Sequence, residues 1–102
     1  MISRNPIAPP RPVPSGFGWI DHRFLRDGHI CRVSREAIAL YLLLVLAADS
    51  NGISFYGDRL IRHLLGFSQP DFENARGELV SAGLVAWEKP VYQLLELAAG
   101  RR

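Results

Sequence analysis

The sequence predicts a small α+β domain, mainly helical, with three helices followed by a two-stranded β-hairpin. Three observations lead to this fold class. Residues 37–48 form an apolar run, two amphipathic segments meet at Gly66, and residues 84–97 alternate on either side of Lys89-Pro90. At 102 residues, the chain has the size of one domain.

Composition divides the chain into a Pro-rich flexible arm at residues 1–18, a folded domain at 19–97 and a frayed basic tail at 98–102. The prolines of the arm favour extended conformations and cannot pack a core. The arm is therefore either a disordered linker or a segment that contacts a partner through Arg4 and Arg11.

The first long helix is expected at residues 34–48. Ser34 is a good N-cap, and Glu36 lies in the first turn, where the helix dipole favours a carboxylate. Because this helix is apolar nearly all round, we expect it to be central and buried on several sides. Before it, we expect an extended piece and a turn at Asp27-Gly28; after it, residues 53–55 predict a single edge strand.

Two further helices are expected at residues 56–65 and 68–82, joined through Gly66. Ser68 is the N-cap of the second, and Pro70 lies in its first turn, where a missing N–H costs nothing. Gly83 ends it as a left-handed residue. A helix, a short turn with glycine and a second helix form the helix-turn-helix pattern. Strands at 84–88 and 91–97 then complete a hairpin.

The sequence offers no chemistry typical of an enzyme. Cys31 is the single cysteine, so neither a disulfide framework nor a thiolate zinc site is expected. His22 and His29 have no second ligand cluster, and Cys31 and Ser34 have no suitably placed histidine and acid. There is no Gly-rich phosphate loop. We therefore expect no enzymatic activity, cofactor, metal or small-molecule substrate.

The order of elements resembles a winged helix-turn-helix domain. The segments GWIDHRFLRDG, SREAIALYLLLVLAADSNG, GDRLIRHLLGFS and ARGELVSAGLV are similar to the N-terminal winged-helix modules of bacterial plasmid and phage replication initiators, and to small accessory proteins of mobile elements. The resemblance covers residues 17–97. It implies a DNA-binding protein, either a sequence-specific regulator or a replication or mobile-element accessory factor, with residues 68–82 as the recognition helix.

Carried over by position, the resemblance places outward residues of the recognition helix in the major groove of double-stranded DNA. Amide and guanidinium groups are the usual readers of base edges, and cations hold phosphates. The expected base readers are Gln69, Asn74 and Arg76, and the expected phosphate contacts are Arg59, Arg62, Lys89, Arg4 and Arg11. Arg76 falls near the inward face, where it would only extend past the core.

The acidic residues Asp71 and Glu73 on the same helix depart from the usual basic pattern. They suit a solvated helix face, or a winged helix used for protein–protein interaction or dimerisation, with Trp87 and Tyr92 as exposed contact residues. The charge is also uneven. Residues 1–35 hold six arginines against two aspartates, and residues 36–102 hold six cations against eight carboxylates.

No apolar run is long enough to cross a bilayer, and the Pro-rich start does not resemble a secretory signal. We therefore expect a cytoplasmic protein without a membrane partner.

Overall fold

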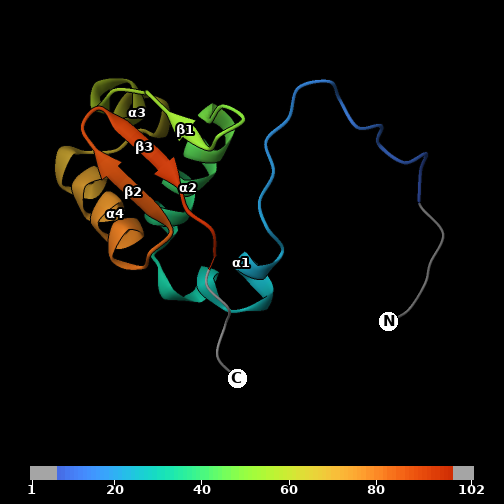
Figure 1. The fold of residues 1–102 in the computed structure, drawn as a ribbon, viewed down its shortest axis with the longest axis horizontal. Coiled ribbons are helices and arrows are strands. Elements are labelled where there is room, and N and C mark those ends of the chain that lie inside the picture. Colours follow the sequence, from blue (N-terminus) through green and yellow to red (C-terminus); the bar gives the residue numbers. More distant parts are fainter. Residues whose placement is uncertain (1–6, 98–102) are drawn as a thin grey trace.

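The fold was analysed in a computed structural model that describes residues 7–97 (Figure 1). Within this range the chain forms, in order, α1 (Arg23–Arg26), a 3₁₀ helix η1 (His29–Arg32), α2 (Arg35–Ala47), β1 (Ile53–Ser54), α3 (Asp58–Leu65), α4 (Gln69–Ser81), β2 (Val85–Glu88) and β3 (Val91–Leu94). The predicted α+β class is confirmed: helices dominate, and the strands form a small antiparallel sheet.

The described residues hold four α-helices, where three were expected. The additional helix, α1, lies where an extended piece was predicted. Its start is stabilised by Asp21, whose carboxylate accepts the backbone N–H of Arg23 at 2.8 Å and its guanidinium at 2.7 Å. These local hydrogen bonds stabilise the chain at the start of the helix turn, although its N-cap residue, His22, makes no side-chain cap.

Helix α2 lies at the centre of the domain and packs against α3, α4, β1 and β3. Ser34 caps it as predicted, its hydroxyl accepting the N–H of Ala37 at 3.1 Å. The helix is not buried all round, however. Leu42 is 49% exposed and Leu46 is 63% exposed, because no described element covers that side. The expectation of burial holds only for the side that faces the other elements.

The three strands are arranged in the order β1-β3-β2, and both pairings are antiparallel. The predicted hairpin is present, with Trp87 opposite Tyr92 in the register of β2 and β3. The predicted edge strand is β1, which pairs Ile53 with Gln93 of β3. The hairpin is therefore widened into a three-stranded sheet by a segment that lies between α2 and α3 in the sequence.

The core lies between α2, α4 and the sheet. Its members are fully or nearly fully buried: Phe24, Ala37, Leu40, Tyr41, Leu44, Val45, Ile61, Phe72, Ala75, Leu79, Leu84, Val85, Tyr92 and Leu97. Figure 1 shows residues 7–20 as an extended segment, without helix or strand, that leads into α1. The side chains of this segment are exposed. No helix within residues 7–97 is long and apolar enough to span a membrane.

Candidate nucleic-acid interface

The connection between α3 and α4 is tight and is determined by three local features. Gly66 adopts a left-handed conformation with φ of 70°, which an L-residue adopts only at a cost. The N–H of Phe67 then donates to the carbonyl of Arg62 at 3.0 Å. Ser68 caps α4 by accepting the N–H of Asp71 at 3.2 Å. These bonds fix the direction in which α4 leaves α3.

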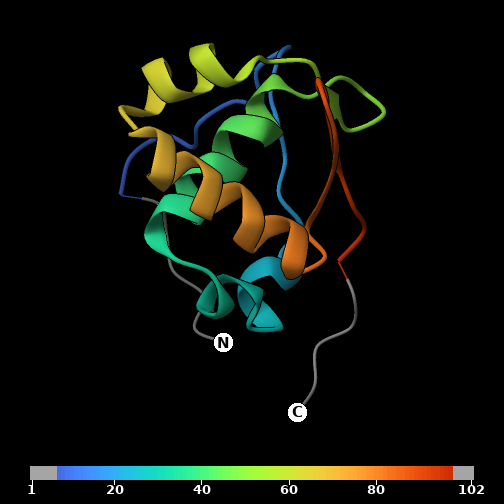
Figure 2. The same ribbon diagram turned by 90° about the vertical axis from the view of Figure 1, so that its left-hand side faces the viewer.

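Helix α4 has a buried side and an open side. Phe72, Ala75 and Leu79 are buried against the core, as their spacing predicts. Figure 2 shows α4 across the middle of one face, with α3 above it and the β2–β3 hairpin along one edge. The exposed residues of α4 are Gln69, Pro70, Asp71, Glu73, Asn74, Gly77, Val80 and Ser81.

Two of the predicted DNA contacts are bonded to one another on this face. The Arg62 guanidinium donates to the side-chain oxygen of Gln69 at 2.9 Å and to the carbonyl of Phe67 at 3.3 Å. The Gln69 amide in turn donates to the Glu73 carboxylate at 2.6 Å. The three side chains form a row that joins the end of α3 to the first turns of α4, so Gln69 and Arg62 have partners before any ligand arrives.

Arg76 lies among aromatic and acidic side chains beneath the hairpin. Its guanidinium carbon lies 3.7 Å from the centre of the Trp87 ring and 4.8 Å from that of Phe72. The guanidinium also contacts Asp58 at 3.5 Å and the Tyr92 hydroxyl at 3.4 Å, and the side chain is only 13% exposed. Stacking at these distances is the main interaction, because both polar contacts are long. This placement matches the expectation that Arg76 extends past the core.

The aromatic residues of the hairpin are not exposed contact residues, contrary to expectation. Tyr92 is 1% exposed, and burial raises the pKa of its hydroxyl. Trp87 is half-buried and stacks on Tyr92 with ring centres 6.3 Å apart. Its indole N–H is buried without a hydrogen-bond partner in the described chain. Trp87 and Tyr92 lie opposite one another on the same side of the hairpin, and Arg76 covers that side.

The other predicted contact residues are spread around α4. Arg59 on α3, Lys89 at the hairpin turn and Asn74 on α4 are exposed, and none forms an ion pair or side-chain hydrogen bond with another residue of the 7–97 range. Arg11 is exposed, and Figure 1 shows the described part of the arm on the side of the molecule away from α4. Arg4 lies outside the described residues.

Sequence reasoning missed Glu78 and Asp58. The Glu78 carboxylate accepts the backbone N–H and the hydroxyl of Ser34, both at 2.7 Å, and so ties α4 to the start of α2. Asp58 reaches Arg76 from α3. The partners lie 44 and 18 residues away in sequence, and no local pattern marks such pairs. The one available signal was a glutamate near the inward side of an amphipathic helix.

The charge on the open side of α4 is negative. Asp71 and Glu73 are exposed, whereas Arg76, the only cation of the helix, is largely covered. No group of histidine, cysteine and carboxylate side chains within the described chain is arranged to hold a metal. His29 is buried, while His22 and Cys31 are exposed.

Comparison with protein-family models, with curated proteins and with solved structures gave no match.

Proposed function

We propose that this chain is a winged helix-turn-helix protein that binds double-stranded DNA through the open side of α4. It would act as a sequence-specific regulator or as a replication or mobile-element accessory factor. The order of α2, β1, α3, α4, β2 and β3 supports the class, because helix, strand, two helices and a hairpin follow one another as in winged helices. Fold alone does not determine function, so the proposal depends on the α4 face.

One observation carries the proposal: α4 presents amide side chains on an open surface flanked by exposed cations. Asn74 is exposed and unbonded, and a Cβ added at Gly77 would meet nothing within 4 Å, so a base edge or backbone can approach closely. Arg59 on α3 and Lys89 on the hairpin lie on the elements that flank α4 (Figure 2). An amide suits adenine, and the two cations suit phosphates on either side of the groove.

The hydrogen-bonded row of Arg62, Gln69 and Glu73 determines how Arg62 and Gln69 would contact DNA. In the free protein, Gln69 is held by Arg62 and Glu73 at 2.9 and 2.6 Å. A phosphate near Arg62 would compete with Gln69 for the guanidinium and release the Gln69 oxygen toward a base. Glu73 and Asp71 would repel phosphates placed close to α4, so the backbone contacts belong to α3 and the hairpin. Arg76 is not proposed as a base reader, because it is stacked beneath Trp87.

The test is fluorescence anisotropy with a random-sequence DNA duplex at two salt concentrations. Arg59→Ala is compared with Arg26→Ala, which removes an exposed arginine from α1 instead. We expect Arg59→Ala to weaken binding to every duplex and to lower the salt slope by about one, whereas Arg26→Ala leaves both unchanged. Equal effects of the two variants, or binding that does not depend on salt, would contradict the proposal.

A second candidate function is self-association through α4, and the charge distribution supports it. The open side of α4 carries Asp71 and Glu73 without a free cation among its described residues, while residues 1–35 carry a net charge of +4. The basic segment of one copy would then meet the acidic helix of another. Sedimentation equilibrium distinguishes this function: a dimer that dissociates in Asp71→Asn/Glu73→Gln supports it, and a monomer at every concentration excludes it.

A further inference from the structure

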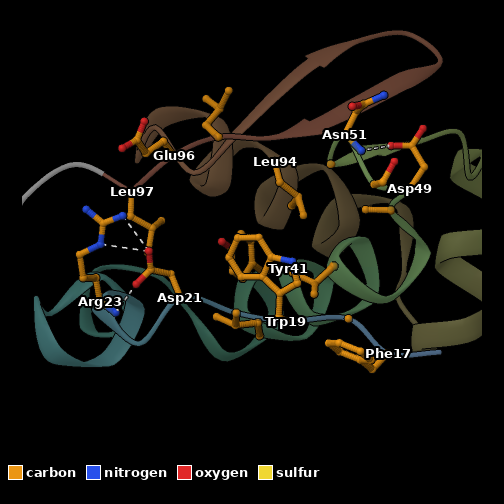
Figure 3. Close-up of a pocket in the computed structure, with 17 residues that line it drawn as sticks. Phe17, Trp19, Asp21, Arg23, Tyr41, Asp49, Asn51, Leu94, Glu96 and Leu97 are labelled. Carbon is orange, nitrogen blue, oxygen red and sulfur yellow. Dashed lines mark hydrogen bonds and ion pairs between the residues drawn. The ribbon is translucent and has the colours of Figure 1, made fainter. Parts of the chain in front are cut away.

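A cavity lies on the side of the domain where the arm meets the fold. It measures about 610 Å³ and lies between residues 17–23, the second half of α2, the turn at 48–52 and the end of β3. Ligand pockets commonly have volumes of about 300–1,000 Å³, so this one has room for a small organic molecule. Figure 3 shows Trp19 and Tyr41 in its middle, with Asp21, Arg23 and Glu96 toward one end and Asp49 and Asn51 toward the other.

Two exposed aromatic side chains, one at the end of the arm and one directly after it, line the cavity. Trp19 is 73% exposed and Phe17 is 65% exposed, although both lie against the folded domain. The backbone between them is held close to α2, since a Cβ added at Gly18 would lie 3.1 Å from both a methyl group and the carbonyl oxygen of Val45. Residues 17–19 therefore form a wall of the cavity, and neither the Phe17 nor the Trp19 ring stacks on another ring among the described residues.

Tyr41 supplies a hydroxyl group to the same cavity. The residue is 5% exposed, and its ring stacks on Phe24 with the centres 4.8 Å apart. Its hydroxyl forms no hydrogen bond with any residue that the structure describes, yet it belongs to the cavity lining. Burial, and secondarily the charge of Asp21, raises the pKa of this hydroxyl, so it keeps its proton and can donate. The Tyr41 hydroxyl is therefore a polar group of the cavity lining that is free to form a hydrogen bond with a bound molecule.

The charges around the cavity favour a cation. Its lining holds three carboxylates and one guanidinium. Asp21 is paired with Arg23 at 2.7 Å, and Asp49 accepts the backbone N–H groups of Asn51 and Ile53 at 2.8 and 3.0 Å. Glu96 forms no hydrogen bond or ion pair within the described chain and is exposed at the same end as the Asp21–Arg23 pair, where its charge also acts on Arg23. The cavity thus has a net negative charge, with one carboxylate available to a ligand.

We propose that this cavity binds a small aromatic ammonium compound. Its ring would lie against Trp19 and Phe17, its polar group would accept from or donate to the Tyr41 hydroxyl, and its ammonium would face Glu96. Aromatic faces and carboxylates both attract an ammonium group, and an anion would meet an excess of negative charge. The sequence alone predicted no small-molecule substrate, and this site is a binding site that does not depend on the function proposed for α4.

The test uses three probes that share one ring system and differ in charge: naphthaleneethylammonium, naphthaleneethanol and naphthaleneacetate. Each is titrated into the full chain, and amide chemical shifts are followed by NMR. We expect the ammonium to shift the amides of Tyr41, Val45 and Gly52, the alcohol to bind at least about fivefold more weakly, and the carboxylate not to bind. No binding of the ammonium, or equal binding of the carboxylate, would overturn the proposal.

Substitutions then locate the site. Trp19→Ala should raise the dissociation constant of the ammonium probe at least about fivefold. Tyr41→Phe, which preserves the stack on Phe24, should leave the affinity for this probe unchanged and should raise the dissociation constant about fivefold only for an analogue that carries a hydroxyl on the ring. Phe55→Ala is the matched control, because Phe55 is an aromatic residue that is also 65% exposed but does not line the cavity. Glu96→Gln should reduce the preference for the ammonium over the alcohol. If Phe55→Ala weakens binding as much as Trp19→Ala, the probe binds exposed aromatics generally and the site is refuted.

Discussion

The two sides of α4 use similar residues for different purposes. On the inward side, Arg76 and Glu78 are engaged with Trp87 and Ser34, and they join the helix to the hairpin and to α2. On the open side, Glu73 and Asn74 are exposed to solvent. The hydrogen-bonded row of Arg62, Gln69 and Glu73 on this side joins residues that are close in sequence. The charge of a residue on this helix therefore does not reveal its role, which depends on the side chains from distant segments that contact it.

The largest expected effect is on the inward side. Phe72 is fully buried, so Phe72→Ala should lower the free energy of unfolding by about 3–5 kcal/mol through lost burial and a cavity. Glu73→Ala, one position along and exposed, should change it by less than about 0.5 kcal/mol. Urea denaturation measures both. Similar effects of the two variants would show that α4 does not have the two sides described.

A smaller loss is expected where α4 holds the start of α2. Glu78→Ala removes two short bonds to Ser34 and leaves a backbone N–H without its partner. The expected destabilisation is about 2 kcal/mol, again measured in urea. Glu36→Ala serves as the control, because it removes a first-turn glutamate that has no such bond in the described chain, and it should cost at most about 1 kcal/mol. Should Glu78→Ala be neutral, the link between α4 and α2 would not contribute to stability.

Arg76→Ala distinguishes a structural arginine from a base reader. Loss of its stacking on Trp87 and Phe72 should cost about 1–2 kcal/mol of unfolding free energy. At a temperature where the variant is fully folded, DNA affinity should be unchanged, because the guanidinium faces the hairpin. Anisotropy with the same duplex measures this. A stable variant that has lost sequence preference would place Arg76 back among the base readers.

The smallest expected effect appears at alkaline pH. Burial holds the pKa of Tyr92 above its ordinary 10.0, so the folded state binds this proton more tightly than the unfolded state. The associated stability is present below pH 10 and is lost as the pH rises through the folded pKa. Tyr92→Phe should therefore lose less stability between pH 9 and 11 than the wild type. Tyr56→Phe, an exposed position, should follow the wild-type curve.

Much of the fold could be predicted because its signals are local. Ser34 and Ser68 cap helices, and Gly66 and Gly83 take left-handed conformations with φ of 70° and 75°, all within a few residues of the groups they serve. The alternation of residues 84–97 similarly revealed the hairpin. The turn of helix at α1 was missed because it depends on a single carboxylate, Asp21, rather than on apolar spacing.

The sites were harder to predict because they form between distant segments. The bond from Glu78 to Ser34 spans 44 residues, and Arg76 is covered only because the hairpin folds back over α4. The cavity at Tyr41 combines four separate parts of the chain, and no one of them carries a ligand motif. Helical spacing placed Arg76 near the inward face but could not determine whether a ring would cover it.

The proposed binding of DNA to the open side of α4 is tested most directly by NMR of the full chain with a DNA duplex. We expect amide shifts to concentrate at Gln69, Asn74 and Gly77, with further shifts at Arg59 and Lys89, and to diminish as salt is raised. Shifts confined to the arm or to α2, or a spectrum that the duplex leaves unchanged, would contradict it.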